Sequence, residues 1–236
     1  MLAAHRTELL RRVPDDARVL DVGGWGAPLS RADWVIDIAP HETRGLYGDD
    51  PDPERFTADT WVQRDICARE PWPFADDEFD FVVCSHTLED IRDPIWVCEE
   101  LSRVARAGYV EVPSRVLEQT WGFDGTWSGY SHHRWLCEAD RERGEMRFTF
   151  KFHLLHHETL RLPPWFAAGL SPEQRVDWLW WEGSVAAREI VHLDPPALFA
   201  ELLDFRARHI DLVPEPPRPP RPPLLRRLAR RVRRID

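Results

Sequence analysis

The chain has 236 residues, 43% of them hydrophobic, so it can bury the core of one α/β domain with additions. Its formal charge is -10, yet the last 21 residues contain eight arginines and one acid, so the remainder is strongly acidic. An acidic body argues against a protein that coats nucleic acid. Four cysteines without a CxxC pair indicate neither a disulfide framework nor a zinc ribbon, and we expect buried thiols.

The ends of the chain carry two expectations about location. No apolar run is long enough to span a bilayer, and the first residues lack the apolar stretch and cleavage site of a signal peptide, so we expect a cytoplasmic protein. Residues 221–236 place four apolar side chains on one helical stripe among seven arginines. This tail predicts peripheral contact with the inner face of the membrane or with an acidic partner, or a role in solubility alone.

The first 115 residues alternate between strand and helix patterns. A short amphipathic helix is predicted at residues 3–12. Five runs rich in β-branched and aromatic residues follow as predicted strands, at 19–23, 34–38, 61–66, 79–85 and 108–113. A helix lies before the last strand, with Asp93 as N-cap and Pro94 in its first turn. This order predicts a Rossmann-like α/β fold, with a mainly parallel twisted sheet flanked by helices.

The pattern changes after residue 115 to a β-rich and helical extension. Residues 133–153 predict two strands around a turn at 141–144, and residues 178–193 predict a further strand region. A helix capped by Asp194 follows. The predicted segments are an N-terminal helix (1–16), a Rossmann-like core (17–115), a sheet extension that covers the acceptor side (116–212), and a Pro-rich linker with the basic tail (213–236).

The turn after the first strand is the candidate ligand site, because ligands bind beyond the carboxyl ends of the strands in open parallel sheets. Gly23, Gly24 and Gly26 allow a ligand to approach the backbone closely. Asp37, at the end of the second strand, can accept hydrogen bonds from ribose hydroxyls. These features alone indicate an adenosine-like ligand.

The same loop is poorly suited to a pyrophosphate. Pro28 removes one amide donor, and only about ten residues separate the glycines from the next strand, which is short for a crossover helix. S-adenosylmethionine carries no phosphate, and its cationic methionyl end suits a nearby carboxylate such as Asp21. The loop therefore favours S-adenosylmethionine over a dinucleotide.

Several segments resemble the successive motifs of class I S-adenosylmethionine-dependent methyltransferases: VLDVGG, VIDI, QRDI, FDFVVCSHTLED and ELSRVARAGYVEVPS. More narrowly, GAPLSRADWVIDI and HHRW are similar to a bacterial branch of the methyltransferase type 11 group. The resemblance covers roughly residues 17–150. It implies transfer of a methyl group from S-adenosylmethionine to an oxygen, nitrogen or carbon atom of a small-molecule acceptor.

The resemblance also implies roles for single residues. The expected cofactor-binding residues are Asp21, Gly23, Gly24 and Gly26 in the methionine loop, Asp37 at the ribose, Asp65 and Ile66 beside the adenine, and Ser85 at the border with the acceptor. The expected acceptor-side residues are His132, His133, Trp135 and Glu118. His86 and His133 are the candidate catalytic residues, although His86 could instead hydrogen-bond the sheet edge.

The sequence departs from the family pattern at a few positions. Trp25 and Ala27 stand where the wider pattern has glycine, and Asp90 stands where the group often has histidine. Trp25 is either an aromatic lid over the ligand or a packing residue. A non-catalytic methyltransferase-fold adapter that carries the basic tail is therefore the alternative to an enzyme. A nicotinamide-dependent oxidoreductase is disfavoured because the phosphate-binding helix is missing.

A cluster of histidines follows the predicted sheet at positions 132, 133, 153, 156 and 157. His153 with His156 or His157 would share one face of a helix. The chain has no HExxH motif and no cysteine at ligand spacing. We therefore expect no metal site from the sequence.

Overall fold

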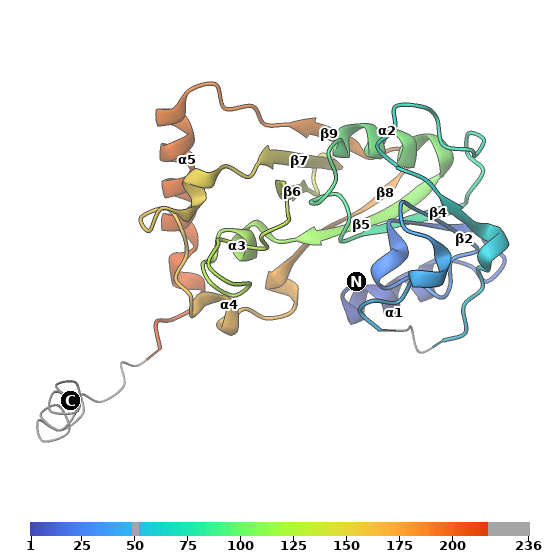
Figure 1. Cartoon of the computed structure of the whole chain (residues 1–236), viewed down its shortest axis with the longest axis horizontal. Coiled ribbons are helices and arrows are strands. Elements are labelled where there is room, and N and C mark those ends of the chain that lie inside the picture. The colour runs from blue at the N-terminus through green and yellow to red at the C-terminus, as the bar shows by residue number, and fades with distance from the viewer. Residues whose placement is uncertain (49–51, 217–236) are drawn as a thin grey trace, which may run out of the picture.

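The central sheet of the computed structural model, which describes residues 1–48 and 52–216, has the strand order β3-β2-β1-β4-β5-β8 (Figure 1). Its strands are β1 (Val19–Val22), β2 (Trp34–Asp37), β3 (Trp61–Gln63), β4 (Phe81–Ser85), β5 (Ala107–Pro113) and β8 (Val176–Glu182). The first five run parallel, and β8 pairs antiparallel with β5. The predicted α/β fold with a mainly parallel sheet is confirmed.

The extension contributes to two sheets. Besides β8, it forms a three-stranded sheet of β6 (Trp135–Asp140), β7 (Glu145–Phe150) and β9 (Ala186–Glu189). The predicted hairpin is β6 and β7, and its turn ends at Gly144 with a φ of +63°, a conformation that glycine adopts without strain. β9 then pairs parallel with β7. The second sheet contacts the central sheet through β6 and β8.

The helices are α1 (Ala3–Arg12), α2 (Pro94–Val104), α5 (Pro195–His209) and the short α3 (Arg115–Glu118) and α4 (Phe166–Gly169). The cap predicted for α2 is confirmed, because the Asp93 carboxylate accepts a hydrogen bond from the Trp96 amide at 3.1 Å. Asp194 holds the N-cap position predicted for α5, but its side chain makes no capping hydrogen bond. In Figure 1, α5 stands far from β2 and β4, on the other side of α3.

The core follows the alternation of the parallel strands. Leu20 and Val22 of β1 face α2 and the second sheet, and they pack with Leu101 and Phe148. Val19 faces the opposite side, where Leu9 of α1 closes the core. The four cysteines are buried and free, as expected.

The connection from β1 to β2 contains no α-helix. It has only a 3-10 turn at Gly24–Gly26, and Asp21 folds the chain back by accepting a hydrogen bond from the Leu29 amide at 2.8 Å. β3 also ends earlier than predicted, at Gln63, because Asp65 accepts a hydrogen bond from the Cys67 amide and turns the chain. Both connections leave the carboxyl ends of the strands open.

Two expectations stay predictions. The division into four segments is one, although β8 and the second sheet show how residues 116–212 extend the fold. The basic tail at 221–236 is the other, since it lies outside the described residues. Within residues 1–48 and 52–216, no helix has the length and apolar character needed to cross a membrane.

Gly108 allows β8 to pair with β5. A Cβ atom at this position would lie 2.5 Å from the ring of Trp181, the residue directly opposite on β8. We expect Gly108→Ala to lower the free energy of unfolding by about 1–3 kcal/mol, measured by chemical denaturation. In a Trp181→Leu background the same change should cost much less; an equal cost in both backgrounds would contradict this packing account.

Candidate functional site

A pocket of about 880 Å³ opens at the carboxyl ends of β1, β2 and β4. This volume is within the range of small-molecule sites. Eleven of the residues predicted for the site line it: Asp21, Gly23, Gly24, Gly26, Asp37, Asp65, Ile66, Ser85, His86, His132 and His133. The residues that line it come from the central sheet and the loops beside it, from the loop that precedes β6, and from Met1 and Arg6 near the N-terminus.

The glycine loop forms the floor of the pocket. Larger residues would not fit at its glycine positions. Gly23 has a φ of +75°, and a Cβ atom there would lie 2.2 Å from Thr87 Oγ1. A Cβ atom on Gly24 would lie 2.3 Å from Asp21 Oδ2. One on Gly26 would lie 2.8 Å from the ring of Tyr47. The loop can therefore present its backbone closely to a ligand.

Asp21 and Asp37 are two buried carboxyl groups beside this loop. Backbone amides donate to both: Leu29 to Asp21, and Trp25 and Ala39 to Asp37. Burial raises the pKa of Asp21 to about 7, and the nearby charge of Asp37 adds to the effect. Burial also raises the pKa of Asp37. A cation in the pocket would lower the cost of ionising both groups.

Asp65 lies at the other side of the pocket, in the turn after β3. Arg92 Nη1 donates to its Oδ2 at 2.7 Å. Burial would raise the pKa of Asp65, but the hydrogen bonds from Arg92 and Cys67 outweigh burial and lower it. Ile66 is buried next to it, with its carbonyl accepting a hydrogen bond from the Trp72 indole.

Trp25 packs against the protein at the edge of the pocket, and its role as a lid over a ligand stays a prediction. It lines the pocket, and it also packs against the hydrophobic cluster on the α1 side of the sheet. Its indole Nε1 donates to Thr43 Oγ1 at 2.9 Å. The side chain is thus held by the protein at the edge of the pocket.

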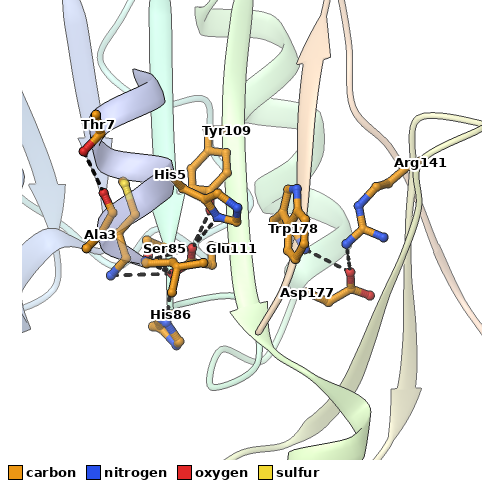
Figure 2. Close-up of polar contacts among 12 residues, drawn as sticks. Ala3, His5, Thr7, Ser85, His86, Tyr109, Glu111, Arg141, Asp177 and Trp178 are labelled. Atoms are coloured by element: carbon orange, nitrogen blue, oxygen red, sulfur yellow. Dashed lines mark hydrogen bonds and ion pairs between the residues drawn. The ribbon is translucent and has the colours of Figure 1, made fainter. Parts of the chain in front are cut away.

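His86 follows β4 with a φ of +54°, an uncommon conformation for a residue other than glycine. Its Nε2 lies 3.2 Å from Glu111 Oε1, and its Nδ1 lies 3.7 Å from Glu89. Figure 2 shows His86, His5 and Tyr109 converging on Glu111. His86 therefore contacts Glu111 of β5, and it also lines the pocket. These contacts are compatible with both roles considered for His86, a catalytic base and a hydrogen bond to the sheet.

Glu111 was missed by the sequence predictions. Its side chain is completely buried in β5 and accepts hydrogen bonds from His86, Tyr109, His5 and the Leu2 amide. Burial would raise its pKa, but the hydrogen bonds from His86, Tyr109 and the Leu2 amide, together with the charge of the N-terminus, hold the pKa below its ordinary value. The ionised Glu111 must accept a proton from His86 Nε2, so the lone pair of the neutral His86 ring lies on Nδ1. An acid inside the apolar run GYVEVP was the available signal.

Glu89 shows the opposite electrostatic behaviour. It is buried in the wall of the pocket, and its Oε2 has no hydrogen-bond partner among the described residues. Burial, together with the nearby charge of Asp90, raises its pKa well above the ordinary value. Glu89 is therefore protonated more readily than an exposed glutamate.

His132, His133 and Asp90 lie together on the side of the pocket that was predicted to receive the acceptor. Two residues predicted there, Trp135 and Glu118, do not line the pocket. The Trp135 indole turns away and donates to the Ile91 carbonyl at 2.8 Å. Glu118 is fully buried behind His133, with its Oε1 2.7 Å from His133 Nδ1. Both residues position the wall of the pocket.

Comparison with known proteins agrees with the fold. Residues 36–110 match the family model of a methyltransferase domain, and no curated protein matches the sequence. Similar solved structures include an S-adenosylmethionine-dependent methyltransferase of Mesorhizobium loti, with 15% identity, a TM-score of 0.37, and coverage of 64% of this chain and 66% of that one.

Another similar structure comes from the Haloferax volcanii complex of the methyltransferase activator Trm112 with a methyltransferase, with 20% identity, a TM-score of 0.35, and coverage of 51% and 52%. The chain thus spans about half to two thirds of these two proteins. Because both TM-scores are below 0.5, the similarity to these two structures adds nothing to what the strand order and the family match show. The match over residues 36–110 and the Rossmann-like sheet together indicate a methyltransferase domain of the class I fold, and such domains bind S-adenosylmethionine.

Proposed function

We propose that the chain transfers the methyl group of S-adenosylmethionine to an oxygen, nitrogen or carbon atom of a small-molecule acceptor. The observation that carries this proposal is the pocket itself, in which a glycine floor without room for Cβ atoms lies beside the buried carboxyl groups of Asp21 and Asp37. Such a cradle suits a ligand with a cationic end and no phosphate. The pocket volume of about 880 Å³ supports a small-molecule acceptor.

Each residue around the cradle has a proposed binding role. Asp37 accepts hydrogen bonds from the ribose hydroxyls, and Asp21 contacts the methionyl amino group. Gly23, Gly24 and Gly26 let the methionine end approach the backbone. Asp65 and Ile66 contact the adenine. Ser85 lies where the cofactor meets the acceptor. When bound, S-adenosylmethionine supplies a methyl group that its sulfonium has already made electrophilic.

The remaining task of the chain is to orient the acceptor and to accept its proton where one must leave. His86 is the proposed base. Glu111 holds the Nε2 proton of His86, as a carboxylate orients the histidine in other proton-transfer sites, and leaves Nδ1 to accept a proton. His133 is the second candidate, with its Nδ1 held by Glu118. His132 lines the acceptor side beside it.

We expect Asp37→Ala to weaken the binding of S-adenosylmethionine by about 10- to 100-fold in calorimetric titration, because a hydrogen bond to a charged group contributes roughly 1.5–3 kcal/mol. Asp59→Ala is the matched control, since Asp59 is exposed and outside the pocket. The demethylated product should also bind to the unchanged protein. If the folded protein binds neither compound, the chain is a non-catalytic adapter and the enzyme proposal fails.

The affinity for S-adenosylmethionine should fall with decreasing pH. Asp21 has a pKa of about 7 in the free folded protein, so its carboxyl is protonated below that pH, whereas a cationic ligand favours the ionised form. The dissociation constant should rise by up to about tenfold per pH unit below about pH 7. Titrations between about pH 8 and about pH 5.5 measure this slope.

The Asp21→Asn variant provides the control for this pH dependence. It keeps an acceptor for the Leu29 amide but cannot ionise. Its slope should be shallower than that of the unchanged protein. An equal slope in both proteins would assign the proton to another group, such as Asp37.

Methyl transfer can be followed with methyl-labelled S-adenosylmethionine and pools of small hydroxyl, amine and carbon nucleophiles. Once an acceptor is found, His86→Ala should lower the rate by about 100- to 10 000-fold, the usual contribution of a general base. The affinity for the cofactor should stay unchanged. A rate that is insensitive to this substitution would exclude His86 as the base.

A further inference from the structure

We propose that Asp90, His132 and His133 form a binding site for a divalent transition-metal ion at the rim of the pocket. One ligand atom from each of the three side chains lies within 4.8 Å of the other two. His132 Nε2 is 3.9 Å from Asp90 Oδ1, and His133 Nε2 is 3.8 Å from the same oxygen. The proposal goes beyond methyl transfer and does not depend on it.

The Asp90 carboxylate supports a ligand between these groups. Its Oδ1 atom is buried and has no hydrogen-bond partner within residues 1–48 and 52–216. Both histidine nitrogens are too far from this oxygen for a hydrogen bond. A buried carboxylate oxygen without a partner is costly, and a cation would remove that cost.

His133 is held in the orientation that a metal ligand needs. Its Nδ1 contacts Glu118 Oε1 at 2.7 Å, so the proton on Nδ1 points to Glu118 and the lone pair on Nε2 points toward Asp90. Lys151 Nζ lies 2.5 Å from the other oxygen of Glu118. A carboxylate behind a histidine is the usual support of a metal site, and here both side chains are buried.

The loop with the two histidines is fixed to the turn that carries Asp90. The amides of Arg134 and Trp135 donate to the Glu89 carbonyl at 2.7 and 3.2 Å. Two ligands on a tetrahedral ion lie about 3.3 Å apart, which follows from metal bonds of about 2.0–2.1 Å. Each histidine nitrogen would thus move about half an ångström closer to Asp90 Oδ1, and the exposed side chain of His132 can also rotate toward His133.

The donor set determines the class of metal. Two imidazoles and one carboxylate suit Zn²⁺, Fe²⁺, Co²⁺ and Mn²⁺, whereas Mg²⁺ and Ca²⁺ prefer oxygen ligands alone. Three protein ligands leave at least one coordination position for an outside ligand. All three residues line the pocket, so this position is accessible from it.

The test is a titration of the untagged full chain with Co²⁺, followed by absorption spectroscopy, and with Zn²⁺, followed by metal analysis after gel filtration. S-adenosylmethionine is left out, so failure of the methyltransferase proposal does not affect the result. We expect one bound ion per chain. His132→Ala, His133→Ala and Asp90→Ala should each weaken binding by about 100-fold or more.

Two further variants separate a metal site from a general loss of structure. Glu118→Gln keeps the volume of the side chain behind His133 and should weaken binding by about 10- to 100-fold. His192→Ala changes a histidine outside the pocket and should bind like the unchanged protein. Absence of stoichiometric binding, or binding that survives all three ligand substitutions, would overturn the proposal.

Discussion

The pairing of two backbone segments holds the candidate site together. Arg134 and Trp135 donate their amides to the Glu89 carbonyl, and the Trp135 indole donates to Ile91. These bonds join the turn after β4 to the loop before β6, and so join the central sheet to the second sheet. The glycine loop and the buried aspartates of the pocket come from the central sheet, and His132 and His133 come from the loop that leads into the second sheet.

The supply of hydrogen-bond donors decides the charge of each buried acid in the pocket. Glu111 receives several donors and stays ionised, although it is fully buried. Glu89 lacks a donor for one oxygen and has a strongly raised pKa. Backbone amides donate to Asp21 and Asp37, and burial raises the pKa of both carboxyl groups. Buried carboxyl groups without a neighbouring positive charge favour cationic ligands. Both proposed ligands, S-adenosylmethionine and a divalent metal ion, are cationic.

Much of the fold was predictable because its signals are local. The helix at α2 carries its cap and proline in sequence, and the β6–β7 hairpin carries its turn glycine. The sequence predictions differ from the structure at the end of β3 and at the cap of α5, where a side chain forms an unexpected hydrogen bond or none. Asp65 ends β3 early through the Cys67 amide, and Asp194 reaches no amide at the start of α5. The structure adds a reason for the glycines of the first loop, because only positions without a Cβ atom tolerate Thr87 beside Gly23 and the Asp21 side chain beside Gly24.

The sequence by itself determined the alternation of strands and helices, the glycine loop and the acids that follow β1 and β2, since each depends on residues near one another in the chain. Only the tertiary structure decided the partners of the distant residues. Glu111 contacts His86, and Glu118 lies behind His133. Asp90 lies beside two histidines that are more than forty residues away in the chain. The physical reason is that strand order and backbone pairing between segments, rather than spacing in sequence, set which side chains share a pocket.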